Sequence, residues 1–137
     1  YMSSFEYFDR ANEKGYDKFT QIAANLAMVA KSPKDLRDDL TVFFLTHSED
    51  STDINGNRKI KAKTIGKMID NTLTLEGLFS IVLFGKVNKN DDGELEYGFE
   101  TQNNGENTCK SPQGMFEDFF IPNNLQYVKD CIKKYEE

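Results

Sequence analysis

Two apolar runs constrain the fold of this chain more than any other feature. Leu40–Leu45 and Leu78–Phe84 are almost unbroken, and both are rich in aromatic and β-branched residues. A strand with one exposed face would alternate apolar and polar residues, so runs of this kind are typical of strands buried on both faces. We therefore predict two central strands, Leu40–His47 and Leu78–Phe84, which are neighbours or near-neighbours covered by helices on both faces.

Apolar residues at helical spacing predict helices around these strands. A short helix is expected over Ser4–Glu13. A clearer pattern predicts a helix over Asp17–Ser32, which ends there because Pro33 disfavours helical geometry in the residue before it. Further helices are expected at Ile65–Ile69 and, with an apolar stripe on one face, at Asn124–Tyr135.

The remaining pattern predicts a β-hairpin toward the C-terminus. Asn90–Gly93 is a turn signal, and it leads into an expected strand at Leu95–Thr101. The 137 residues fit one domain of about 100–200 residues. The order of helix, buried strand, helix, hairpin and helix indicates an α/β layered domain rather than a helical bundle or a β-sandwich.

Composition excludes several classes of protein. The 11 Phe and 6 Tyr are too many for a disordered chain, which would lack material for a core. Two cysteines, Cys109 and Cys131, make neither a disulfide framework nor a zinc site. No apolar run approaches the ~20 residues that a membrane helix needs. These features predict a soluble intracellular protein with no membrane partner.

A basic stretch stands out, because the chain as a whole carries a formal charge of −6. Five basic residues and no acid fall within ten positions, and alternate lysines would project to one side if the segment is extended. One interpretation is an ordinary solvated loop, and the other is contact with nucleic-acid phosphates. The five residues are Arg58, Lys59, Lys61, Lys63 and Lys67.

The tripeptide His47-Ser48-Glu49 follows the first predicted strand. In open α/β sheets ligands bind beyond the carboxyl ends of strands, so these side chains are candidates for sensing a ligand phosphate. The alternative is a polar strand end that continues into a loop. His47 is the one histidine of the chain, and Phe99 stands where a calcium loop beginning at Asn88 would need glutamate, so we expect no metal site.

Several blocks of the sequence, taken together, resemble a known family. The chain is similar to the C-terminal half of phage-encoded, RecA-related P-loop ATPases used in single-strand annealing and recombination. The similarity spans nearly all of the chain. The blocks that carry it are Asn12–Phe19, Leu40–Glu49, Lys63–Asp70, Leu75–Leu83, Thr101–Gly105 and Lys110–Glu117.

The resemblance implies a partial RecA-like layered sheet with flanking helices and a C-terminal β-hairpin. It also implies roles for particular residues. His47 with Ser48 and Glu49 would be the γ-phosphate sensor, and Ser48–Thr64 would be the second DNA-binding loop. Lys110 would reach the nucleotide of a neighbouring subunit in a homo-oligomer, and Gln102 would contact the cofactor.

The sequence contains no Gly-x-x-x-x-Gly-Lys-Ser/Thr loop. In the family this loop and the magnesium-binding strand precede the part that the chain resembles, and the chain opens with Tyr1, so we expect a piece of a longer protein. ATP and Mg²⁺ would then bind the complete protein, and this chain alone is expected to be inactive.

Two function hypotheses follow. The first is a segment of a RecA-like ATPase that acts on single-stranded DNA in the cytoplasm of a bacterial host, supplying sensor, DNA-loop and subunit-contact elements. The second is a stand-alone, non-catalytic module that binds and blocks a host protein. Hydrolase chemistry at His47-Ser48-Glu49 is disfavoured, because the sequence names no second base and no oxyanion donor.

Overall fold

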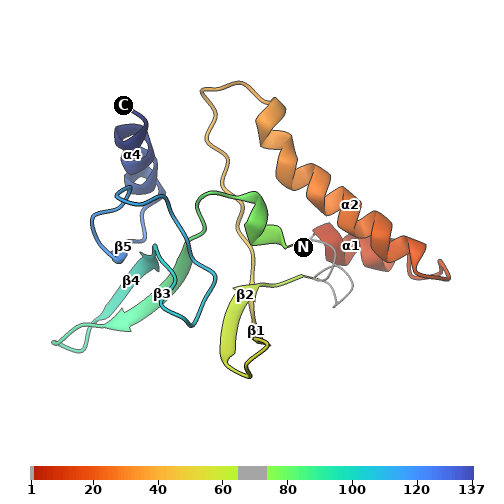
Figure 1. Ribbon diagram of the computed structural model, residues 1–137, viewed down its shortest axis with the longest axis horizontal. Helices are drawn as coiled ribbons and strands as arrows, with labels where there is room; N and C mark the ends of the chain where they lie inside the picture. Colours follow the sequence, from red (N-terminus) through yellow and green to blue (C-terminus); the bar gives the residue numbers. More distant parts are fainter. Residues whose placement is uncertain (1, 65–73) are drawn as a thin grey trace. The chain divides into compact units, whose positions relative to one another are not determined.

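A computed structural model of the chain describes residues 2–64 and 74–137 (Figure 1). The chain divides into two compact units. The first unit comprises Tyr1–Glu49 and Ala62–Leu78, and the second comprises Asp50–Lys61 and Phe79–Glu137. The expectation of one domain stays a prediction.

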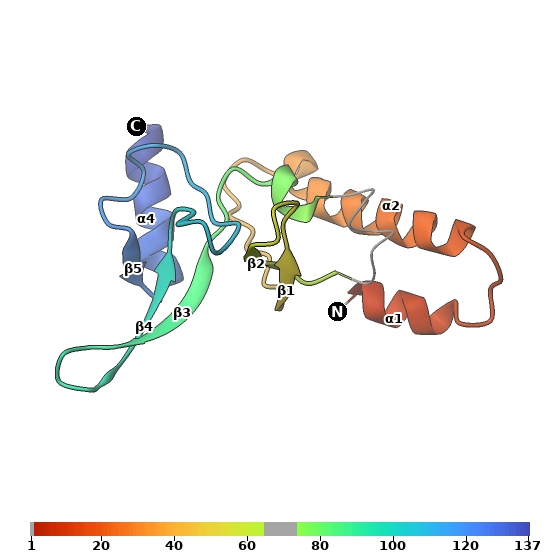
Figure 2. The same ribbon diagram turned by 60° about the horizontal axis from the view of Figure 1, so that its bottom comes forward.

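The first unit is built on two helices that lie side by side (Figure 2). They are α1, Met2–Asp9, and α2, Asp17–Lys31. Two short 3₁₀ turns, η1 at Ser32–Asp35 and η2 at Leu75–Leu78, follow later in the chain. Ile22 and Ala23 of α2 are buried, and Tyr7 and Leu26 pack against them.

Local signals account for α2. Asp17 lies in its first turn and Lys31 in its last, where each charge complements the helix dipole. Pro33 lies in η1, directly after the helix, as the sequence predicts. The predicted helix over Asp17–Ser32 is therefore confirmed. The predicted helix at Ser4–Glu13 corresponds to α1, which begins earlier and ends at Asp9.

The second unit contains a three-stranded antiparallel sheet in the order β3-β4-β5. Its strands are β3, Phe84–Lys89, β4, Leu95–Glu100, and β5, Phe120–Pro122. The Asn90–Gly93 turn joins β3 to β4, and Gly93 has a φ of +83°, a conformation that glycine adopts without strain. The predicted hairpin turn and its second strand are confirmed, but the first strand is Phe84–Lys89 and not Leu78–Phe84.

The closing helix of the second unit is α4, Leu125–Glu136. The side chain of Asn124 accepts hydrogen bonds from the backbone N–H groups of Gln126 and Tyr127, so it caps the helix. Val128 of α4 is buried. The predicted helix at Asn124–Tyr135 is confirmed.

A second hairpin is formed by β1, Ser48–Thr52, and β2, Arg58–Ala62. The side chain of Asp53 organises its turn by accepting hydrogen bonds from the backbone N–H groups of Asn55 and Asn57, both at 2.8 Å. The Asn55–Gly56 turn signal accounts for this connection, because Gly56 has a φ of +85°.

The prediction of buried strands at the two apolar runs is wrong. Residues 40–47 form no strand, and Leu45 is 85% exposed. In the second run, Val82 makes a single antiparallel bridge with Lys110 and a strand begins only at Phe84. A run of apolar residues indicates a preference for burial. A buried strand also needs hydrogen-bond partners for its backbone N–H and C=O groups along both edges. The two described sheets, β1-β2 and β3-β4-β5, do not include residues 40–47.

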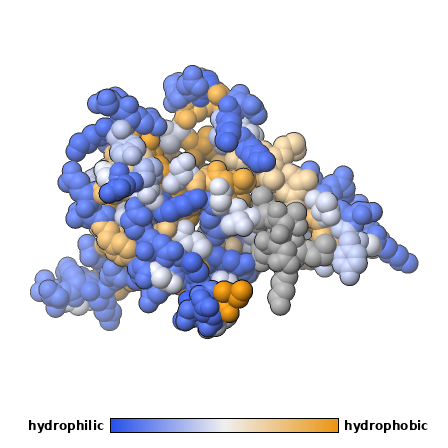
Figure 3. All heavy atoms as spheres, viewed as in Figure 1, coloured by the Kyte–Doolittle hydropathy of each residue, from blue (hydrophilic) through white to orange (hydrophobic). Residues whose placement is uncertain are grey.

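The mixed α/β class is confirmed: helices accompany one two-stranded and one three-stranded sheet. The described strands do not form the layered sheet that the RecA resemblance implies. Apolar residues also reach the surface (orange in Figure 3). The predicted helix at Ile65–Ile69 lies outside the described residues. Among the described residues, no helix combines the length and apolar character needed to span a membrane.

Candidate functional site

The basic stretch coincides with β2. Side chains two positions apart in a strand share a face, so Lys59 and Lys61 project to the same side of β2. Lys63 follows directly after the strand, and its backbone N–H donates to the carbonyl of His47 at 2.7 Å. Lys67 lies outside the described residues. The alternation that the sequence predicts is therefore present at Lys59 and Lys61.

Arg58 is engaged within the hairpin. Its guanidinium donates two hydrogen bonds to the carboxylate of Asp50, at 2.9 and 3.0 Å. Hydrogen bonding to Asp50, with the charge of that carboxylate, raises the pKa of Arg58 above its usual value. Because the Asp50 carboxylate already binds the guanidinium group, Arg58 is a weaker candidate for a phosphate contact than the lysines.

Both edges of β2 are held. Its first edge pairs with β1, where the Ser51 hydroxyl donates to the carbonyl of Lys59 at 3.0 Å. On the other edge, the Ile60 N–H donates to the carbonyl of Glu106 at 2.7 Å, and Ile60 forms a parallel bridge with Asn107. The strand that carries the lysines is thus fixed to the loop between Thr101 and Ser111.

That loop is fastened by a buried polar cluster, which we call the Glu100 cluster. Glu100 is 3% exposed, accepts from Lys86 Nζ at 2.6 Å and accepts from Asn107 Nδ2 at 2.5 Å. Asn107 Oδ1 in turn accepts from the backbone N–H of Cys109 at 3.0 Å. Hydrogen bonding to Glu100 raises the pKa of Lys86. The cluster joins β3, β4 and the loop through satisfied polar groups.

Burial raises the pKa of the Cys109 thiol to about 12, and the charge of Glu100 adds to this effect. A thiol reacts as its thiolate, so Cys109 is a structural rather than a nucleophilic residue.

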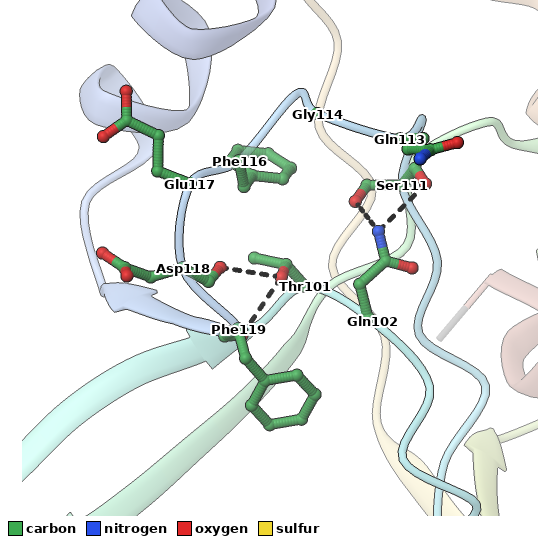
Figure 4. A pocket seen from close by; sticks show the side chains of 9 residues that line it. All are labelled: Thr101, Gln102, Ser111, Gln113, Gly114, Phe116, Glu117, Asp118 and Phe119. Atoms are coloured by element: carbon green, nitrogen blue, oxygen red, sulfur yellow. Dashed lines mark hydrogen bonds between the residues drawn. The ribbon is translucent and has the colours of Figure 1, made fainter.

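A cavity of about 420 Å³ lies beside the ends of the same loop (Figure 4). The Gln102 side-chain amide donates to the carbonyl and hydroxyl oxygens of Ser111, at 3.1 and 2.6 Å. The Thr101 hydroxyl lies 3.1 Å from the carbonyl oxygens of Asp118 and Phe119. The residues that line the cavity are Thr101, Gln102, Ser111, Gln113, Gly114, Phe116, Glu117, Asp118 and Phe119.

The other predicted site residues occupy different places. His47 and Ser48 are exposed, and Glu49 is half-buried. These three belong to the first unit, whereas Gln102 and Lys110 belong to the second. Lys110 is half-buried, and its backbone pairs with Val82 just before Ser111 of the cavity.

Gln102, named only through the resemblance, lines the cavity, and its predicted contact with a cofactor stays a prediction; the Glu100 cluster was not predicted from the sequence. Glu100 follows Gly98 and Phe99 in a strand, and no motif marks it. Its partners Lys86 and Asn107 lie on other segments, so only the folded chain brings the three together. Within residues 2–64 and 74–137, no three His, Cys, Asp or Glu side chains are grouped so that they could hold a metal ion.

No protein-family model, curated protein or solved structure matches this chain. The resemblance to RecA-related ATPases therefore stays a prediction. The candidate site is defined by the chain's own residues: the lysines of β2, the loop held by the Glu100 cluster, and the cavity at the ends of that loop.

Proposed function

We propose that this chain binds single-stranded nucleic acid through the lysines of β2. The observation that carries the proposal is the position of Lys59 and Lys61 on one face of a strand whose two edges are both held. At ~3.3 Å per residue, side chains two positions apart start about 6.6 Å from each other. Because the backbone of β2 is already held on both edges, the two lysines can reach successive phosphates without prior ordering of the strand that carries them.

The charge of the chain supports this location. The formal charge of −6 repels phosphates in general, so binding has to be local. Arg58 is paired with Asp50, so the proposal assigns the phosphate contacts to Lys59 and Lys61, which are half-buried, and to Lys63, which is exposed. A few contacts of this kind favour a flexible single strand, whose backbone can adapt to a short row of charges.

The wider role follows from the resemblance. In this proposal the chain is a segment of a phage-encoded RecA-like ATPase in the cytoplasm of a bacterial host. His47, Ser48 and Glu49 sense the nucleotide, and Lys110 reaches the nucleotide of a neighbouring subunit. ATP and Mg²⁺ bind the complete protein, because phosphoryl transfer needs a glycine-loop cradle and a carboxylate-held magnesium that this sequence lacks.

The test is the affinity of the chain for a labelled oligothymidylate, measured by fluorescence anisotropy across a salt titration. Replacing Lys59, Lys61 and Lys63 by Gln should weaken binding. Each lost contact should reduce the slope of log affinity against log salt by about 0.7, because each neutralised phosphate of a single strand releases a counterion.

A matched control removes three lysines elsewhere: Lys34 in η1 with Lys129 and Lys133 on α4 are exposed, and their replacement by Gln changes the net charge equally. The control variant should keep the wild-type slope. Equal slopes in the β2 variant and the wild type would reject the proposed function.

One observation favours a second candidate function, a module that binds and blocks a host protein. The apolar segment Leu40–Leu45 is exposed, and a contiguous apolar surface is typical of protein interaction sites. This function predicts a stoichiometric bacterial protein that co-purifies with the chain and is lost with Leu45→Asp. Oligonucleotide affinity should be unchanged by Leu45→Asp, which separates the two candidates.

A further inference from the structure

The cavity between Thr101 and Phe119 has an uncharged interior and a charged rim. Figure 4 shows the Phe116 ring turned toward the side of the cavity formed by Gln102 and Ser111. The carboxylates of Glu117 and Asp118 point away from that side. The inner surface therefore offers an aromatic ring, a hydroxyl group and a side-chain amide.

Some hydrogen-bonding groups on this inner surface remain available to a ligand. The amide Nε2 of Gln102 is used by Ser111, and the carbonyl Oε1 takes no part in those two bonds. The Ser111 hydroxyl accepts from Gln102, so its own hydrogen is available to donate. Gln113 adds a second amide at the edge. A planar, uncharged ring with donors and acceptors along one edge complements this set.

The cavity is also tied to β2 through the loop described above. Gln102 and Ser111 are the two ends of that loop, and its middle is bonded to β2 by Ile60 with Glu106 and Asn107. All of these residues belong to the second unit. The strand β2, which carries Lys59 and Lys61, is therefore bonded to the same loop that forms one wall of the cavity.

We propose that this cavity binds one nucleobase of the single strand whose phosphates contact β2, an inference that rests on the proposed function. The base stacks on Phe116 while Gln102 and Ser111 bond its edge. The volume of about 420 Å³ falls within the roughly 300–1,000 Å³ of small-molecule sites. The rim carboxylates disfavour a free phosphate, so the base rather than the phosphate occupies the cavity.

The test compares two labelled oligomers of equal length on the full chain: an oligothymidylate and its abasic deoxyribose-phosphate counterpart. The wild type should bind the intact oligomer roughly 5- to 150-fold more tightly, as expected for one stacked base. Gln102→Leu and Phe116→Leu should reduce this ratio toward one and leave abasic binding and its salt slope unchanged. Gln126→Leu, an equivalent change on the exposed face of α4, should keep the wild-type ratio.

The outcomes separate the two proposals. A wild-type ratio of one, with salt-dependent binding of both oligomers, overturns the base site and retains phosphate binding by β2. Binding of neither oligomer overturns both proposals. Thymidine monophosphate that competes as strongly as the oligothymidylate would assign the cavity to a free nucleotide and overturn the strand-base assignment.

A second measurement does not depend on the stability of a variant. An oligonucleotide carrying 4-thiothymidine, irradiated in complex with the wild-type chain, should crosslink to the segment that contains Phe116 and Phe119. Crosslinks that all map outside residues 101–119 would overturn the base site.

Discussion

Glu100 is the residue on which the described site depends most directly. It is almost fully buried, and both of its partners are side chains from other segments. A buried carboxylate that loses a partner keeps its desolvation cost without compensation. The Glu100 cluster thus explains how the Thr101–Ser111 loop keeps its place against β3 and β4.

We expect Lys86→Met to lower the free energy of unfolding by about 1–3 kcal/mol at neutral pH, because it removes a charged hydrogen bond to Glu100 while Asn107 remains. Lys89→Met, an exposed position of the same strand, should change it little. Urea denaturation of both variants measures the difference. Equal midpoints would show that the ion pair contributes nothing.

The same pair predicts a pH dependence. The pKa of Lys86 is raised above its ordinary value of 10.5, so its stabilisation is fully present below that pH and is lost as the pH rises through the raised value. The difference in free energy of unfolding between the wild type and Lys86→Met should therefore persist up to about that ordinary lysine pKa. Above it the difference should disappear. A difference that disappears between about pH 7 and pH 9, well below the ordinary lysine pKa, would contradict this assignment.

The β4–β5 pair is closely packed at Gly98. A Cβ atom added at Gly98 would collide with the Phe120 ring and the Ile121 carbonyl, whereas one added at Gly85 would make an ordinary contact with Phe99. Gly98→Ala should therefore destabilise the chain by about 1–3 kcal/mol, as overpacked sites do. Gly85→Ala is the control, and thermal unfolding followed by circular dichroism compares them. Equal melting temperatures would refute the close approach.

Two predictions concern nucleotide binding and turnover at the scale of the whole chain. The sequence contains no glycine-loop cradle, so we expect calorimetry of the isolated chain with Mg-ATP to show no micromolar binding. In a longer protein that carries the cradle, Lys110→Ala should slow turnover more than it weakens ATP binding, because the role proposed for Lys110 is to act on the transferring phosphate of a neighbouring subunit. An unchanged turnover number would remove this role of Lys110.

Local patterns in the sequence were sufficient for α2, α4, the turn between β3 and β4, and β4 itself. Helical spacing, Pro33 after α2 and the glycine turn at Gly93 act within a few residues, so they can be recognised without knowing the rest of the fold. The alternation of Lys59 and Lys61 was predictable for the same reason. An extended segment places such side chains on one face wherever it lies.

The degree of burial of Leu40–Leu45, the Glu100 cluster and the cavity depend on contacts between separate segments of the chain. Whether Leu40–Leu45 is buried depends on which strands lie beside it, and its own composition contains no information about those partners. Glu100, Lys86 and Asn107 are separated in sequence, and the cavity joins Gln102 and Ser111 to Phe116 and Phe119 only because the loop folds back on β4 and β5. Local preferences act between near neighbours in the sequence, whereas a site is formed by residues that folding brings together.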